Sequence, residues 1–434
     1  MRVSMQNIFA AHFDAYATQH RLHPRESRAA WCIRNCYTSA CGSHTLRCPQ
    51  GHFTHEQFHA CSHRSCPRCS PRTRASWIDA ELGRLLPCPH FHVVFTLPHE
   101  LLLLWQFNRE RLIQLFFDAV RHTLLELLAD PRHLGATPGL LMALHTWGRN
   151  LSHHPHIHAL VTAGGLTPDL RWRPTRDGFL LPLKPLQRLF CGKLLAGLLA
   201  LLHSSELRLP PRQPASYWAS LLRSLYRKHW NVQINPAYSS GRSVTLYLAR
   251  YAKGGPLPKH RPLFLHHGTV SFDYTDHRNK QSNRLHLAPA EFISRVLWHA
   301  PPTGVHTVRH AGLYATAARR HHLHALISLT SNAADPPPAY HAAPQARPTT
   351  SSAPRCPTCN APLWRSYSAA ARSRTQGKNQ IPLYQSAHSR ATTSHLGPTT
   401  PFKPKRNGKP PGPGWWYTVH SHQPGPGGLP PRSA

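Results

Sequence analysis

The feature that most constrains this chain is a block of cysteines and histidines between residues 32 and 69. Its clearest element is Cys61-x4-Cys66-x2-Cys69, because a short Cys-x2-Cys turn lets two thiolates approach one tetrahedral zinc ion. A segment this short and polar cannot bury a core of its own, so we expect a closed, structural Zn²⁺ site to hold its fold. The alternative is that the reduced cysteines are buried as small hydrophobic side chains.

Residues upstream of this element raise the number of candidate zinc ligands to eight, which is enough for two sites of four ligands. The candidates are Cys36, Cys41, His44, Cys48, His52, Cys61, Cys66 and Cys69. Cys32, His55, His59 and His63 are spare candidates, and the spacing does not divide the ligands between sites. A further short pair, Cys356 and Cys359, lies far downstream with no second cysteine pair after it. We interpret it as a stray pair or a degenerate remnant.

The charge balance points to nucleic acid as the partner. Lysine and arginine number 51 and the acidic residues 17, so the formal net charge is +34. An excess of this size suits a protein that neutralises many phosphates and releases their counterions. The alternative is a non-specific cationic protein of the ribosomal kind.

The sequence also bears on the cellular compartment. Residues 1–20 lack the continuous apolar core of a signal peptide. The nearest candidate for a membrane span, residues 189–203, carries Lys193 and is expected to be a packed helix. We therefore expect an intracellular, cytoplasmic protein, in which reduced cysteines serve metal binding rather than disulfides.

Three regions are predicted along the chain: an N-terminal helix and zinc-binding domain at 1–75, a main domain at 85–325 and a Pro-rich basic tail at 330–434. The tail has few aliphatic residues to bury and is expected to be disordered. Patterning in the rest predicts an α+β fold around one sheet. Strands are expected at 91–97, 139–147, 156–164 and 230–234, a hairpin at 262–274, and helices at 11–30, 100–128, 184–203, 214–229 and 242–254.

The strand predicted at 156–164 carries two histidines, His156 and His158, one residue apart. Side chains alternate between the faces of a strand, so both imidazoles share one face and the intervening apolar residues share the other. Two imidazoles this close can hold a divalent cation that keeps open positions for phosphate oxygens and water. The alternative is a pair of solvent-facing histidines in a chain that has 36 of them.

A second unusual element is the run "YLARYAKGG", which holds Tyr247 and Tyr251. On a helix these two tyrosines project from one face, because they are four residues apart. Such a pair is more often packed in a core, yet Arg250, Lys253 and the Gly-Gly stop are unusual for a core helix. Nearby cations would favour the phenolate form, which is a nucleophile.

Together these motifs resemble the two-tyrosine HUH transposases of rolling-circle insertion sequences. The resemblance includes "SCPRC" at the end of the zinc block, "HVVFTLPHEL", "LHTWGRNLSHHPHIHALVTAGGL", "YLARYAKGGP" and "VRHAGLYA", and covers roughly residues 10–325. It departs from the family at "CPQGH", where a Cys-x2-Cys is usual, so that His52 becomes a candidate partner of Cys48. A second departure is Cys41 in "ACGSH".

The resemblance implies a replication-initiator-like HUH nuclease domain with a central antiparallel sheet, preceded by a small zinc-binding domain that helps to grip DNA. It implies Mg²⁺ or Mn²⁺ on His156 and His158, with His145 and Asn150 as candidates for a third ligand. Tyr247 and Tyr251 would be the nucleophiles that form 5′-phosphotyrosine links with single-stranded DNA ends. Arg250 and Lys253 would hold phosphates.

Two other functions fit parts of the pattern. A plasmid replication initiator or conjugative relaxase uses the same chemistry at an origin, although this chain shows no helicase segment. A non-catalytic, zinc-containing DNA-binding protein is the other alternative. The presence of both histidines and both tyrosines argues against it.

Overall fold

A computed structural model describes residues 1–176, 178–239, 242, 245–246, 248, 254–257, 261–276, 281–316 and 354–367. Its centre is an antiparallel sheet with the strand order β12-β5-β6-β4-β8, with β7 paired to the far end of β6. The strands are β4 (His90–Thr96), β5 (Thr137–Trp147), β6 (His153–Leu166), β7 (Trp172–Pro174), β8 (Val232–Tyr238) and β12 (Val308–Gly312). The predicted α+β class and central antiparallel sheet are therefore confirmed.

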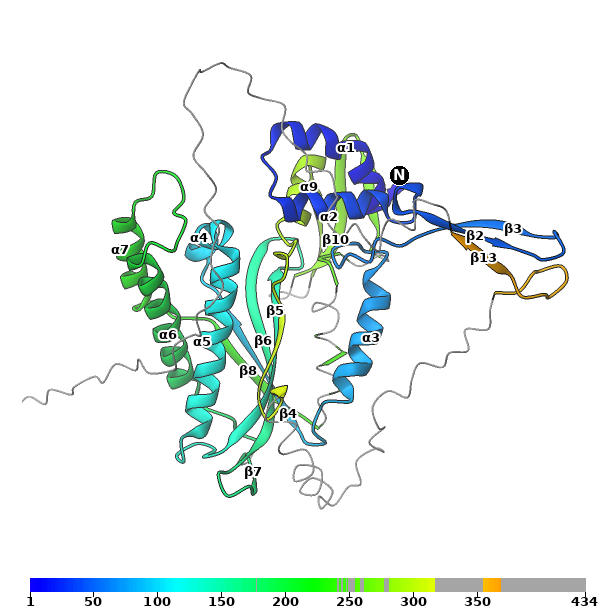
Figure 1. Ribbon diagram of the computed structural model, residues 1–434. Coiled ribbons are helices and arrows are strands. Elements are labelled where there is room, and N and C mark those ends of the chain that lie inside the picture. The colour runs from blue at the N-terminus through cyan, green and yellow to red at the C-terminus, as the bar shows by residue number, and fades with distance from the viewer. Residues whose placement is uncertain are drawn as a thin grey trace, which may run out of the picture. The chain divides into compact units, whose positions relative to one another are not determined.

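Helices cover one face of this sheet, as Figure 1 shows on the left of the view. They are α4 (Leu102–Phe107), preceded by the 3₁₀ turn η2 (His99–Leu101), α5 (Arg109–Ala129), α6 (Leu183–His203) and α7 (Ala215–Leu225). The alternate strand residues Ile157, Ala159 and Val161 share the large core with these helices. The regular alternation of polar and apolar side chains in β6 thus assigns its apolar face to the helices.

Helix α6 is long and apolar enough to cross a membrane by length and composition. Its buried side chains recur at helical spacing, from Leu186 through Phe190 and Leu194 to Leu198, and they belong to the core beside the sheet. The prediction of a packed helix here is confirmed.

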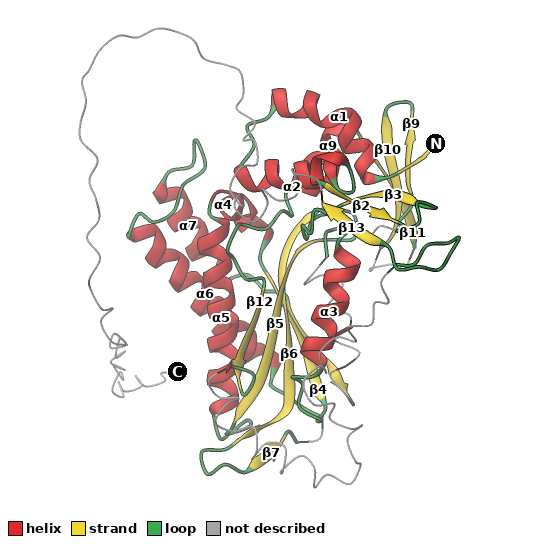
Figure 2. Cartoon of the chain, turned by 45° about the vertical axis from the view of Figure 1, so that its right-hand side comes forward, coloured by secondary structure: helices red, strands yellow, loops and turns green. Residues whose placement is uncertain are grey.

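The opposite face of the sheet carries a smaller apolar cluster of Leu141, Ala143, Leu160, Leu248 and Tyr314. Side chains from α3 (Ser70–Leu82) and the loop after it pack against this cluster. Figure 2 shows α3 running along this side of β5 and β6. This face also bears the histidines discussed below.

A second core combines the N-terminal helices with residues 263–300. The helices α1 (Met5–Gln19), α2 (Pro24–Asn35) and α9 (Pro289–Leu297) pack with a sheet of order β1-β9-β10-β11. Its strands are β1 (Arg2–Val3), β9 (Leu263–His266), β10 (Thr269–Thr275) and β11 (Ser282–Leu287). The hairpin expected at 262–274 is confirmed as β9 and β10, whose turn contains Gly268 with a φ of +70°.

Two of the expected helices are each divided in two. The helix expected at 11–30 is two helices, because His23 and Glu26 form a capping box around Pro24, the first residue of α2. The helix expected at 100–128 is divided at Asn108, whose side chain bonds the backbone of Leu104 and Arg208 instead of extending one helix.

The expectation of a disordered tail was wrong for residues 354–367. Strand β13 (Trp364–Tyr367) pairs with β2 (Ser43–Arg47), which also pairs with β3 (Thr54–Phe58). The 3₁₀ turn η1 (Ser39–Cys41) precedes β2. Backbone pairing and a cysteine cluster order this segment, although its composition offers few apolar side chains.

Candidate functional site

Three histidines gather on the sheet face that faces away from α5 and α6. His145 on β5 lies directly across the ladder from His156 on β6, and His158 follows two residues later on the same face. The ring centroids of His145 and His158 are 4.0 Å apart, and the ligand atoms of all three residues lie within 4.8 Å of one another. Such a group suits a divalent cation that keeps open positions.

The structure distinguishes the two candidates for a third ligand. His145 is in the cluster and is 1% exposed. Asn150 is in the turn after β5, where its side-chain oxygen accepts a hydrogen bond of 3.1 Å from the Ser152 N–H. A position on the strand directly beside His156 is what brings His145 to the site.

Neighbouring groups orient the imidazoles. The Nδ1 of His156 lies 2.6 Å from the backbone oxygen of His154, which directs Nε2 toward a ligand when Nδ1 carries the proton. His92 on β4 places its Nε2 2.7 Å from Nδ1 of His158, and the Asn235 amide donates to the other nitrogen of His92 at 3.2 Å. Sequence reasoning missed His92, although strand alternation in "FHVVFTL" predicts its face.

The imidazoles are neutral at ordinary pH, as metal binding requires. Burial lowers the pKa of His156 and of His92 to about 4. For His145 and His158, burial and then the neighbouring histidines lower the pKa well below its usual value. Each neutral imidazole has a nitrogen lone pair that could bind a metal ion in place of a proton.

Arg64, which sequence reasoning also missed, connects the zinc block to this site. It lies between Cys61 and Cys66, donates a 2.7 Å hydrogen bond to Thr307, and contributes to the low pKa of His145. Burial lowers the pKa of Arg64 itself to about 10, so it remains charged. A cation near His145 is a candidate contact for a phosphate group.

The residues Tyr247, Arg250, Tyr251 and Lys253 lie outside the part of the chain that the structure describes. Some of their neighbours in the sequence are described. Residues 242, 245, 246 and 248 have helical backbone, and Leu248 is fully buried in the apolar cluster on the histidine face. Farther along, a Cβ on Gly255 would lie 3.0 Å from the backbone oxygen of Ser65. Leu248 therefore lies on the same side of the sheet as His145, His156 and His158.

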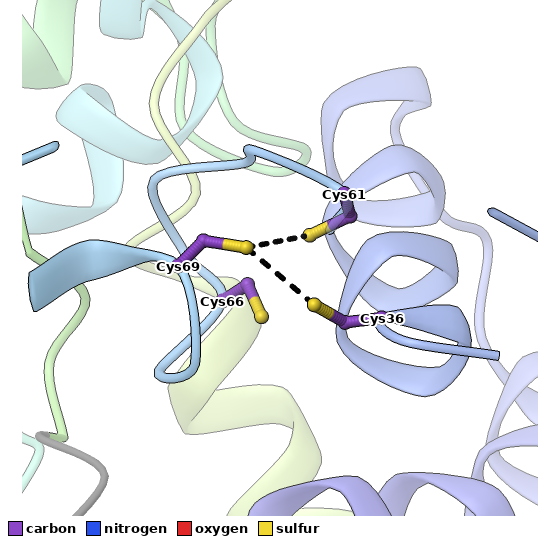
Figure 3. A group of neighbouring side chains, drawn as sticks. All are labelled: Cys36, Cys61, Cys66 and Cys69. Atoms are coloured by element: carbon purple, nitrogen blue, oxygen red, sulfur yellow. Dashed lines mark hydrogen bonds between the residues drawn. The ribbon is translucent and has the colours of Figure 1, made fainter. Parts of the chain in front are cut away.

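Four cysteines of the zinc block form one cluster, shown in Figure 3. The Sγ of Cys69 is 3.4 Å from that of Cys36 and 3.6 Å from that of Cys61. Thiolates bound to one tetrahedral zinc at about 2.3 Å are about 3.7 Å apart. Cys36, Cys61, Cys66 and Cys69 therefore fit a closed, structural zinc site.

Of the remaining zinc candidates, only Cys48 and His52 belong to a cluster among the described residues. Cys48 and His52 form a second cluster with Cys356 and Cys359. The interpretation of Cys356 and Cys359 as a stray pair was therefore wrong. Cys41 and His44 belong to neither cluster among the described residues, and Nδ1 of His44 instead lies 3.0 Å from Nε2 of His59.

Three other buried histidines, His90, His153 and His299, are expected to make the protein sensitive to acid. Burial lowers the pKa of His90 to about 4 and those of His153 and His299 to about 3. The unfolded chain takes up protons near pH 6.5, whereas the folded chain does not. Stability is therefore complete above pH 6.5 and falls below it, by about 2 kcal/mol per histidine at pH 5.

Urea unfolding at pH 7.5 and pH 5.0 tests this prediction, with His299→Gln as the matched variant. The variant should lose about 2 kcal/mol less than the unchanged protein between the two pH values, because it has one such histidine fewer. Zinc release in acid affects both proteins equally. Equal losses in the two proteins would refute the assignment to His299.

Comparisons with known proteins agree with these observations. A family described as "Putative transposase" matches residues 139–322, and one described as "Transposase zinc-binding domain" matches residues 8–97. The "Putative transposase y4qJ" of Sinorhizobium fredii is 34% identical over 73% of this chain and 81% of its own length. The "Transposase for insertion sequence element IS801" of Pseudomonas savastanoi pv. phaseolicola is 31% identical over 75% of this chain and 80% of its own length. No solved structure matches the chain.

Proposed function

The chain belongs to the transposase family that includes the transposase of insertion sequence element IS801, a family of DNA-processing enzymes, and from this premise we propose its chemistry. It cleaves and rejoins single-stranded DNA through 5′-phosphotyrosine intermediates, as an HUH endonuclease and strand transferase of rolling-circle transposition. The observation that carries the proposal is the cluster of His145, His156 and His158 on the sheet face that also buries Leu248.

The proposed metal ligands are the three clustered histidines. When Mg²⁺ or Mn²⁺ is bound there, it supplies Lewis-acid polarisation of the scissile phosphate. Neutral imidazoles of low pKa, one of them oriented by the His154 carbonyl, support this role. Imidazole is a softer ligand than the oxygens that Mg²⁺ prefers, so Mn²⁺ is expected to bind more tightly.

Tyr247 and Tyr251 are the proposed nucleophiles. A helix would present both hydroxyls on one side, and the burial of Leu248 on the histidine face supports their proximity to the metal ligands. The phenol oxygen forms a bond to phosphorus while the bond from phosphorus to the 3′ oxygen breaks, and the 3′ oxygen leaves as a hydroxyl. The phosphotyrosine conserves the bond energy, so a second 3′ hydroxyl can displace the tyrosine without ATP.

Other residues serve to hold the DNA. Arg250 and Lys253 follow the first tyrosine by three and six residues and are proposed to bind phosphates, as Arg64 is beside His145. The net charge of +34 supports binding along the DNA backbone. The zinc-binding domain would fix the segment that carries Arg64. A protein acting on chromosomal DNA is expected in the bacterial cytoplasm, at the nucleoid.

A cleavage assay tests the proposal directly. Single-stranded DNA from the ends of the element, labelled at its 3′ end, is incubated with the full chain and Mg²⁺ or Mn²⁺. The expected result is a labelled protein–DNA adduct on a denaturing gel, formed with the metal and lost with EDTA. Binding without any adduct would instead favour the non-catalytic DNA-binding alternative. A replication initiator is disfavoured because both of the relatives compared are named transposases.

A further inference from the structure

We propose that Cys48, His52, Cys356 and Cys359 bind a second structural zinc ion, which attaches the tail segment 354–367 to the N-terminal β2–β3 hairpin. The four ligand atoms lie within 4.8 Å of one another. The Sγ atoms of Cys48 and Cys359 are 3.5 Å apart, close to the value of about 3.7 Å expected on a tetrahedral zinc. Two of these ligands lie outside residues 8–97, the part matched by the zinc-binding domain.

The two ligand-bearing turns have the same backbone closure. The Cys48 N–H donates to the Phe53 oxygen at 2.8 Å, and the Cys356 N–H donates to the Ala361 oxygen at 2.8 Å, five residues ahead in each case. Each turn also contains one residue in the left-handed region, Gly51 with a φ of +78° and Asn360 with a φ of +61°. This repeated turn brings two ligands of each segment toward one point.

The strands that follow these turns pair with one central strand. Strand β3 lies along one edge of β2 and β13 along the other, both antiparallel. Two similar turns and a three-stranded sheet thus bring the four ligands together, with Cys48 and Cys356 buried and His52 and Cys359 exposed. This is the arrangement of a zinc ribbon made from two distant parts of the chain.

The apolar contacts of this ribbon are too few to hold it without a metal. Its core consists of Leu46 and Leu363 with the two buried cysteines, and Phe53 packs at its side. Trp364, the first residue of β13, is 69% exposed and adds little. Cys48 and Cys359 are 311 residues apart in sequence, so holding them together costs considerable chain entropy. Zinc binding supplies folding free energy in small domains and would offset that cost.

Zinc content per chain tests the proposal. The full-length protein and its Cys356→Ser/Cys359→Ser variant are purified in the presence of zinc and measured by inductively coupled plasma mass spectrometry. The variant is expected to hold one zinc fewer per chain. The difference is read rather than the total, because imidazole ligands such as those of the three-histidine cluster can also bind zinc. Cys88→Ser is the matched control, since Cys88 is half-buried and belongs to neither cysteine cluster.

A second variant separates zinc loss from general misfolding. Cys359→His replaces one zinc ligand by another and should keep the wild-type zinc content, whereas Cys359→Ala should lose one ion. Trypsin supplies an independent readout, because Arg355 and Arg365 flank the cysteine pair. Cleavage there should accelerate at least tenfold in the serine variant and remain slow in Cys88→Ser. Wild-type zinc content or unchanged cleavage in the serine variant would overturn the proposal. Neither readout depends on DNA cleavage, so the proposal can fail independently of the proposed function.

Discussion

Covalent attachment of DNA should disappear when Tyr247 and Tyr251 are both replaced by phenylalanine. Phenylalanine keeps the ring and removes the oxygen that bonds to phosphorus, so adduct formation should fall by about 10³-fold or more. Each single variant should retain one adduct and lose the transfer that requires two nucleophiles. The measurement is the labelled adduct on a denaturing gel, with DNA binding followed separately by fluorescence anisotropy.

Two further tyrosines make this experiment specific. Tyr217 on α7 is 46% exposed on the helical layer, so Tyr217→Phe should leave adduct formation unchanged. Tyr314 is an alternative nucleophile to exclude, because its hydroxyl lies 2.6 Å from Nε2 of His90 on the sheet face that bears the histidine cluster. An adduct that survives the double substitution at Tyr247 and Tyr251 and vanishes in Tyr314→Phe would transfer the nucleophile assignment to Tyr314.

Local periodicity was sufficient to predict the strand that carries His156 and His158. A side chain in a strand alternates faces whatever the strand pairs with, so two histidines one residue apart must share a face. The structure agrees, with Ile157 between them in the core under α5 and α6. The same rule places the side chain of His92 in "FHVVF" on one defined face of its strand. A single histidine in a strand does not by itself indicate a metal site, so His92 was not predicted from the sequence.

Long-range pairing was not predictable from the sequence. His145 became distinguishable from Asn150 only through the register of β5 against β6, which depends on the packing of the whole sheet. From the sequence alone, Cys356 is interpreted as part of a stray pair, because ligand spacing identifies partners only within a short segment. Its partners in the structure, Cys48 and His52, lie some 300 residues earlier. The break between α1 and α2, in contrast, was signalled locally by Pro24 and its capping box.

Replacing both His156 and His158 by alanine is expected to lower the rate of metal-dependent cleavage by a factor of about 10³ or more. Without the metal ligands, no Lewis acid would polarise the scissile phosphate. DNA binding should be unaffected, because it depends on the positively charged surface. Cleavage is followed at a series of Mn²⁺ concentrations, together with Mn²⁺ binding by isothermal titration. His203→Ala is the control, because His203 is exposed at the end of α6 on the opposite layer.

The third ligand is then decided by comparing His145→Ala with Asn150→Ala. His145 contributes an imidazole to the cluster, so its loss should raise the Mn²⁺ concentration needed for half-maximal cleavage by about 10- to 100-fold. Asn150 caps the turn after β5 through its bond to Ser152, so its loss should lower thermal stability slightly and leave the Mn²⁺ requirement unchanged. The converse result, a raised requirement in Asn150→Ala alone, would mean that His145 only packs beside the metal. In that case His145 would be a packing residue. Its low pKa reflects burial, and an uncharged imidazole can be buried at modest cost in free energy.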